Sequence, residues 1–261
     1  MADATDRRNR DQRNHTRLHP TRTGAGRTDR RPHRRQRRHR ARDSATRPDG
    51  GCRRHPRRAQ PDRLEAAAAD VGTQRTAAFD ANDPIALRRF FEDLPTRIDH
   101  VLVTAGGPRY APLLEMDADE VRRQLTAHIM LGLEVARNAA NKMRPGGTLL
   151  FMGGTGGRRI GHGLGIASAA TAALPPFTAA LALELAPVRV NLIAAGFVDT
   201  PLSASLLGDR LDERRNKLRT KLPIGRVVGP TDVAALAVHI MSNTALTGAT
   251  YDIDGGQQFV F

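Results

Sequence analysis

The sequence predicts an α/β fold in which helices cover both faces of a parallel sheet. Short apolar stretches alternate with longer stretches whose apolar residues recur at helical spacing. Strands that alternate with helices in this way pair in parallel, and the helices then pack on both sides of the sheet. With 261 residues, the chain has room for one such domain and a tail.

The tail and the domain differ in composition. Residues 1–60 contain 20 Arg, no Lys and six Asp, and Leu18 is the only Leu, Val, Ile or aromatic residue among them. Residues 61–261 contain 21 basic and 21 acidic residues, so the net charge of +14 belongs to the tail. Such a tail buries too little apolar surface to offset the entropy of ordering its backbone. We therefore predict that residues 1–60 are disordered.

Two interpretations of this tail compete. A natural arginine-rich arm would bind nucleic-acid phosphates without sequence preference, because it has no aromatic residues for base stacking. The alternative, which we favour, is that the segment is not native coding sequence. Arg, Pro, His and Gly without Lys is the composition of a GC-rich gene read in the wrong frame. Nucleic acid is therefore not among the expected partners.

Several other classes of protein are disfavoured. Cys52 is the single cysteine, which excludes an intrachain disulfide and a paired-cysteine metal site. No secretory signal is recognisable, so we expect a cytoplasmic protein. Residues 162–183 carry no charge over a length that could span a bilayer. Because they are rich in Ala, Gly and Thr and contain Pro175-Pro176, we predict a buried helix and no membrane partner.

Capping residues mark where the helices of the domain begin. Pro61-Asp62 open the first helix, and Asp83-Pro84 open the second. Helices are predicted over residues 61–69, 83–91, 117–143, 165–186 and 231–241. The third is amphipathic and is followed by a Pro-Gly-Gly stop signal, and the fourth bends at its two prolines.

Short runs of apolar residues between these helices predict the strands. They lie over residues 75–80, 100–104, 148–152, 188–194 and 249–254. Glycines or acids follow most of these runs. In open parallel sheets, ligands bind beyond the carboxyl ends of the strands. The residues at these strand ends are therefore the candidates for a ligand site.

Four segments at strand ends occur in the order and spacing of a known family. They are Asp80, Thr104-Ala105-Gly106, residues 188–200 and residues 251–256. Together they resemble the short-chain dehydrogenase/reductase family over residues 61–261. The resemblance implies a Rossmann-type doubly wound parallel sheet and an oxidoreductase that uses NAD or NADP on an unidentified carbonyl or alcohol substrate. It also implies a homodimer or homotetramer.

The same resemblance assigns the cofactor-binding residues. In the family, the acid at the position of Asp80 holds the adenine end of the cofactor. The other implied cofactor-binding residues are Thr104, Ala105, Gly106, Gly196, Val198 and Thr200. Glycines at strand ends allow the backbone to approach a ligand closely. For Gly107 and Gly157, a tight strand-to-helix turn is an equal alternative.

The start of the family's sheet has no recognisable counterpart. The family binds the cofactor pyrophosphate at a glycine-rich turn between its first strand and first helix, but here only Gly24 and Gly26 are near, with no strand before them. We therefore predict a sheet that lacks its first strand-helix-strand unit. The strands at 75–80 and 100–104 then lose a shared neighbour, which exposes an aggregation-prone edge.

The family's catalytic side chains are also absent. In the family, a tyrosine moves the proton, a lysine four residues later lowers its pKa, a serine polarises the carbonyl and an asparagine holds a water relay. The positions that match these four read Ala167, Thr171, Gly154 and His128.

Two residues are candidates to replace the missing groups. His128 titrates near neutral pH, and Thr155 offers a hydroxyl beside the serine position. The alternative role of His128 is a helix histidine bonded to a neighbouring backbone carbonyl, and His162 reads as an exposed loop residue. No metal site is predicted. Two functions stay open: an active oxidoreductase, or a catalytically silent homologue that binds a dinucleotide or a partner.

Overall fold

The computed structural model describes residues 61–260 except Gln74, Thr96 and Arg159. The interpretations of residues 1–60 fall outside the described residues. The described domain begins with α1 (Pro61–Val71), a helix found where the sequence predicts one.

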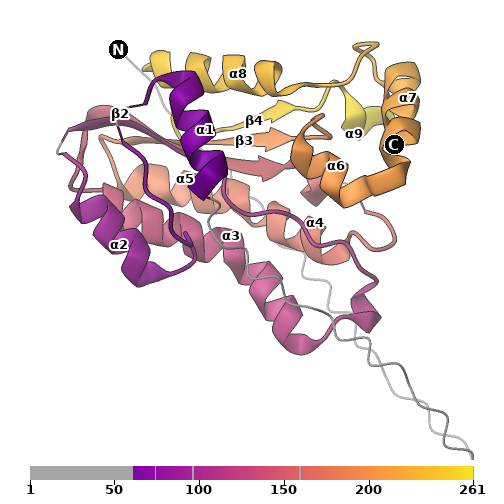
Figure 1. The fold of residues 1–261 in the computed structure, drawn as a ribbon, viewed down its shortest axis with the longest axis horizontal. Helices are drawn as coiled ribbons and strands as arrows, with labels where there is room; N and C mark the ends of the chain where they lie inside the picture. Colours follow the sequence, from indigo (N-terminus) through magenta and orange to yellow (C-terminus); the bar gives the residue numbers. More distant parts are fainter. Residues whose placement is uncertain (1–60, 74, 96, 159, 261) are drawn as a thin grey trace, which may run out of the picture. The chain divides into compact units, whose positions relative to one another are not determined.

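The described residues form one parallel sheet of four strands (Figure 1). The strands β1 (Ile98–Val103), β2 (Met143–Gly154), β3 (Arg189–Ala195) and β4 (Thr250–Ile253) lie in that order across it. Every neighbouring pair is parallel, so all four strands end at the same edge of the sheet. The predicted α/β class with a parallel sheet is therefore confirmed.

Helices cover both faces of this sheet (Figure 1). On one face lie α2 (Pro84–Glu92), α3 (Ala118–Ala139) and α5 (Leu174–Glu184), and on the other lies α8 (Pro230–Ser242). Successive residues of a strand point to opposite faces. Accordingly, the fully buried Leu149 packs in the core on the α3 side, whereas its neighbour Leu150, also fully buried, packs in the core on the α8 side. Burial on both faces explains why the strands are continuously apolar.

Two helices begin where the sequence predicts a helix start, and each start is capped by an aspartate. The Asp83 carboxylate accepts hydrogen bonds from the backbone amides of Ile85 at 2.9 Å and Ala86 at 3.2 Å at the start of α2. The Asp117 carboxylate accepts one from the Glu120 amide at 2.8 Å at the start of α3. These bonds satisfy backbone donors that have no partner within the helix.

The predicted strand at residues 75–80 is wrong. This segment has no regular structure. Phe79 packs the segment against α2, since the centroid of its ring lies 5.0 Å from that of Phe90. A strand needs a hydrogen-bonded neighbour, and the described chain provides no strand between this segment and β1. The apolar pattern was therefore present, but the pairing partner was not.

The β1 strand lies at an edge of the sheet. Among the described residues it pairs only with β2, in a register that places Val101 opposite Leu149. The Leu102 side chain on this edge is 42% exposed. No strand among the described residues pairs with the other side of β1.

The predicted single helix over 165–186 is two helices. α4 (Gly165–Ala172) is followed by its C-cap residue, Ala173. α5 then begins at Leu174 and has prolines in its first turn. Proline is tolerated there because the first turn has no acceptor for the missing N–H. By length and composition, with a mean hydropathy of 1.5, residues 165–184 could cross a membrane, and 33% of this stretch is buried. The predicted buried helix is therefore found only in part: the buried residues of α5 are Leu174, Thr178 and Leu181, and α5 packs on β3 and α3.

Helices that the sequence did not indicate follow β3. They are α6 (Pro201–Leu207), the short 3-10 helix η3 (Gly208–Arg210) and α7 (Leu211–Lys221). Three more short helices complete the described chain: η1 (Leu113–Glu115), η2 (Thr155–Arg158) and α9 (Gln257–Val260).

Candidate functional site

The carboxyl ends of β1 and β2 form the centre of the candidate site. Thr104, Ala105 and Gly106 follow β1 and are exposed. Gly106 has φ +104°, in the region that favours glycine, and a Cβ atom there would lie 3.1 Å from His128 Nε2 on α3. The structure therefore brings His128 against the loop in which the sequence placed the cofactor.

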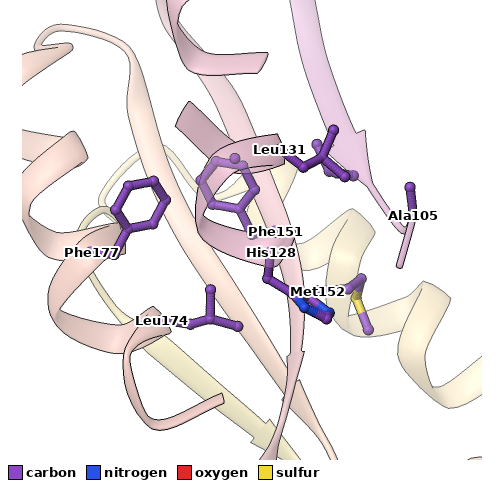
Figure 2. Close-up of a pocket in the computed structure, with 9 residues that line it drawn as sticks. Ala105, His128, Leu131, Phe151, Met152, Leu174 and Phe177 are labelled. Atoms are coloured by element: carbon purple, nitrogen blue, oxygen red, sulfur yellow. The ribbon is translucent and has the colours of Figure 1, made fainter. Parts of the chain in front are cut away.

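A small cavity lies behind this loop (Figure 2). His128 lines it together with apolar side chains. Those side chains are Val103, Ala105, Leu131, Phe151, Met152, Leu174 and Phe177. Figure 2 shows the imidazole of His128 next to Met152. Among the described residues that line the cavity, His128 is the only one with a titratable side chain.

The surroundings of His128 determine its charge. Burial lowers the pKa of the imidazole below its ordinary value of 6.5. His128 Nδ1 is buried and has no hydrogen-bond partner among the described residues. The interpretation of His128 as a histidine bonded to the backbone is therefore not supported at this nitrogen. A neutral imidazole has one N–H donor and one acceptor, so His128 can bind a hydroxyl, a carbonyl oxygen or a water molecule.

The residues that the resemblance places at the family's tyrosine and lysine positions lie on α4. Thr171 Oγ1 donates to the Ala167 carbonyl oxygen at 2.9 Å, so this hydroxyl is bonded within the helix. A Cβ atom on Gly156 would lie 3.3 Å from Thr171 Oγ1, which places Thr171 beside the end of β2. Gly154, at the serine position, ends β2 and has no side chain. Ala167 has no proton to give, and Thr171 has no charge.

Thr155 lies directly after β2, in η2, and is only 2% exposed. Its side chain is therefore covered by protein in this conformation. The exposed His162 lies in the loop before α4, where the Ala111 amide donates to the Gly163 carbonyl at 3.0 Å. Of the two candidate replacements for the missing catalytic groups, the structure presents His128 to the cavity and buries Thr155.

The loop after β3 is held in place by bonds that the sequence did not reveal. Arg215 on α7 donates to the Asp199 carboxylate from Nε at 2.9 Å and from Nη2 at 2.7 Å. Thr200 caps α6, since its Oγ1 accepts from the Ser203 amide at 3.3 Å. Val198 bridges to Val228. Asp199 and Arg215 are 16 residues apart, so no local pattern in the sequence could have paired them.

Gly196 has a packing role in addition to the one that the resemblance implies. A Cβ atom there would lie 2.6 Å from the Asp254 Cβ atom, closer than two such atoms can approach. Gln257 Oε1 accepts from the Phe197 amide at 2.9 Å. The loop after β3 is thus packed tightly against the turn after β4.

Asp80 lies apart from this cluster in the sequence, before α2. It is exposed, and its Oδ1 accepts from the backbone amide of Asn82 at 2.9 Å. One carboxylate oxygen is therefore engaged in a local turn. Across the described chain, no group of three or more His, Cys, Asp or Glu side chains is placed to hold a metal ion.

Comparison with known proteins agrees with this architecture. The family model described as Enoyl-(Acyl carrier protein) reductase matches residues 54–258. Carbonyl reductase family member 4 of Xenopus tropicalis is 27% identical over 201 residues, which cover 74% of this chain and 82% of the relative. Human 3-oxoacyl-[acyl-carrier-protein] reductase is 27% identical over 204 residues, covering 75% and 83% of the two chains.

Solved structures show the same fold. BdcA in complex with NADPH superimposes with a TM-score of 0.66 at 25% identity, covering 75% of this chain and 80% of its own. A small-chain dehydrogenase in complex with NADPH has a TM-score of 0.67 at 24% identity and covers 74% and 91% of the two chains. This second likeness shows the fold alone.

Proposed function

Since this chain belongs to the short-chain dehydrogenase/reductase family of NAD(P)-dependent oxidoreductases, we propose that it binds a nicotinamide dinucleotide and interconverts a carbonyl compound and an alcohol. The observation that carries the proposal is the position of His128. Its imidazole lies against Gly106, at the strand end where the family binds its cofactor, and it is the titratable group in the cavity.

The described residues fit one part of such a cofactor. Thr104, Ala105 and Gly106 follow β1, are exposed and carry no large side chain. The loop with Val198 and Thr200 follows β3, which lies two strands from β1 in the sheet. These residues would hold the nicotinamide end, and Asp80 would hold the adenine end. When bound, the dinucleotide supplies or accepts a hydride. NADPH in the solved structure of BdcA supports this choice of cofactor.

His128 takes the proton-handling role in this proposal. In the direction of reduction, the substrate oxygen gains a proton as its double bond to carbon is lost. The neutral imidazole donates that proton from its N–H and recovers one from water. Burial, which lowers the pKa, keeps the resting ring neutral, so that it carries one N–H to donate and one nitrogen that accepts a proton from water. His128 has no protein partner at Nδ1 among the described residues that would compete for this role.

A second function is favoured by a different observation. The α4 face that matches the family's tyrosine and lysine carries only Ala167 and Thr171, and the Thr171 hydroxyl is bonded inside the helix. A chain with this face would bind the dinucleotide and transfer no hydride. It would then act as a silent homologue through the same site.

One experiment separates the two functions. The full chain is titrated with NADPH by fluorescence, and NADPH oxidation is then followed across a panel of aldehydes and ketones. The His128→Ala variant is compared with His162→Ala, which makes the same change at an exposed histidine outside the cavity. Turnover lost only in His128→Ala supports the active enzyme. Binding without turnover supports the silent homologue, and the absence of binding of both NADPH and NADH in the same titration rejects both.

We also propose that the protein is a cytoplasmic homo-oligomer that associates through α3 and α5. Met130 on α3 is 48% exposed and Leu183 on α5 is 83% exposed. Apolar side chains on neighbouring helices favour burial against a second copy. Light scattering after size-exclusion chromatography tests this, and a monomer mass would reject it.

A further inference from the structure

A buried glutamine follows the last strand of the sheet. Gln257 is the first residue of α9 and is only 4% exposed. A buried side-chain amide needs hydrogen-bond partners, because it has lost its contact with water. Gln257 Oε1 accepts from the backbone amide of Phe197 at 2.9 Å, a residue 60 positions earlier in the chain. The side chain is therefore bonded to the loop after β3.

The position of Gln257 is itself fixed by its neighbours. The buried Asp254 carboxylate accepts from the Gly256 amide at 2.8 Å through Oδ1 and from the Gln258 amide at 3.0 Å through Oδ2. The Gln257 amide donates to the Asp254 carbonyl oxygen at 3.1 Å. A side chain holds another group precisely only where its own backbone is held. The turn after β4 thus keeps Gln257 Oε1 at a set position.

Two consecutive amides of the loop after β3 are bonded to this part of the chain. The Gly196 amide donates to the carbonyl oxygen of Ile253, the last residue of β4, at 3.1 Å. The next amide, of Phe197, donates to the Gln257 side chain. Because a peptide unit is planar, this second bond also fixes the direction of the Gly196 carbonyl group. Gln257 therefore holds the loop one residue beyond the point where β4 ends.

The loop is held again two residues later. The Asp199 amide donates to the Val228 carbonyl oxygen at 3.0 Å, and the Asp199 carboxylate binds Arg215. Val198 lies between Phe197 and Asp199, so its backbone is held on both sides. Val198 is one of the residues to which the proposed function gives the nicotinamide end of the cofactor. Gln257 provides the hold on the β3 side of this residue.

We infer that Gln257 is a positioning residue for cofactor binding: its Oε1 holds the loop after β3 in the conformation that accepts the nicotinamide end of the dinucleotide. Gln257 acts through the Phe197 amide and needs no contact with the cofactor itself. A loop that is already ordered loses less conformational entropy when a ligand binds. The effect on affinity rests on the proposed function, whereas the hold on the loop does not.

Three variants isolate the acceptor oxygen. Gln257→Met keeps the length of the side chain and removes the oxygen, while Gln257→Glu keeps an oxygen at the same reach. The matched control is Gln258→Met. It makes the same change at the neighbouring glutamine, whose Nε2 donates to Asp252 Oδ2 at 3.0 Å.

The first experiment tests the hold on the loop without any cofactor. Exchange of the Phe197 amide hydrogen is followed by NMR in the full chain. The Leu192 amide, which donates to the Ala249 carbonyl oxygen at 3.0 Å inside the sheet, is the reference for opening of the whole fold.

Relative to Leu192, exchange at Phe197 should become about tenfold faster in Gln257→Met, the effect of losing one hydrogen bond. It should stay unchanged in Gln258→Met and in Gln257→Glu. An unchanged ratio in Gln257→Met, or one that rises equally in either of the other variants, would overturn the inference. A variant in which both amides exchange faster in proportion has lost general stability, which also contradicts a local hold.

The second experiment tests the effect on the cofactor. NADPH or NADH, whichever binds the unaltered protein, is compared by calorimetry with the matching ADP-ribose fragment, which lacks the nicotinamide ring. In Gln257→Met the affinity for the dinucleotide should fall about tenfold, while that for the fragment stays unchanged. An equal loss for both ligands, or no loss for the dinucleotide, rejects the positioning role. If the unaltered protein binds neither dinucleotide, the proposed function fails, while the exchange experiment still decides whether Gln257 holds the loop.

Discussion

Arg189 Nη1 donates a hydrogen bond to the Ile240 carbonyl oxygen at 2.9 Å and thereby joins the first residue of β3 to the last turn of α8. The same guanidinium also donates to the carbonyl of Met241 at 2.8 Å and to that of Asn243 at 3.0 Å. The last carbonyls of a helix have no partner within it and carry partial negative charge. A buried cation therefore stabilises this helix end without a carboxylate.

Replacing this arginine should weaken the fold strongly. Arg189 is only 6% exposed, and Arg189→Met leaves several buried carbonyls without donors, at a cost of about 2–4 kcal/mol in the free energy of unfolding. The control is Arg144→Met, whose side chain is 52% exposed beside Asp99 and should cost less than about 1 kcal/mol. Urea unfolding measures both, and equal losses would contradict this role.

The stability of the domain should depend on His128 at mildly acidic pH. The folded-state pKa of His128 lies below its ordinary value of 6.5, because burial disfavours the charged ring. The unfolded chain therefore takes up a proton first as the pH falls below 6.5. The contribution of His128 to the free energy of unfolding is therefore fully present above pH 6.5. It is lost as the pH falls from 6.5 to the lower pKa of the folded state.

The matching measurement is the free energy of unfolding at pH 7.5 and at pH 5.5. The loss between the two should be smaller in His128→Asn than in the unaltered protein. It should persist in His162→Asn, since that histidine is exposed. A loss of the same size in all three proteins would show that another group is responsible.

A substitution at Gly106 should weaken cofactor binding by more than its effect on the backbone alone explains. Gly106→Ala places a Cβ atom 3.1 Å from His128 Nε2, while Gly146→Ala adds one where nothing lies within 4 Å. Both glycines have positive φ, at +104° and +76°, so both variants carry a similar backbone cost. In Gly106→Ala the contact between the new Cβ atom and His128 adds about 1–3 kcal/mol. Because the contact lies in the candidate site, NADPH affinity should fall about tenfold in Gly106→Ala and stay unchanged in Gly146→Ala. Equal affinities in the two variants would remove Gly106 from the site.

The edge of β1 that no described strand covers should make the protein prone to association. A lysine on an edge strand discourages pairing with other chains, so Leu102→Lys should reduce light scattering as the protein is concentrated. Leu202→Lys on α6 is the control, because the two leucines are similarly exposed, at 42% and 43%. If both variants scatter alike, general hydrophobicity rather than the strand edge drives the association.

The sequence predicted those features that depend on neighbouring residues. The starts of the helices at Asp83 and Asp117 were predicted correctly, and in both the capping carboxylate and the amide it accepts from are two or three residues apart. The parallel sheet was predictable from the alternation of strands and helices. The strand at 75–80 failed because pairing depends on a neighbour from elsewhere in the chain.

The candidate site was predictable only in part. His128 was identified from its place in the family pattern, and the structure puts it beside Gly106. The burial of Thr155 and the pairing of Asp199 with Arg215 depend on how distant segments pack. Neither leaves a periodic or local signal.

The contact between Gly196 and Asp254 couples the position of the loop after β3 to that of the turn after β4. Because there is no room for even one carbon atom between them, the turn after β4 acts as a rigid brace for the loop that carries Val198 and Thr200. Gln257 completes this brace through its bond to the Phe197 amide. Trimming the chain a few residues from its carboxyl end would therefore loosen the loop after β3, some 60 residues earlier in the chain.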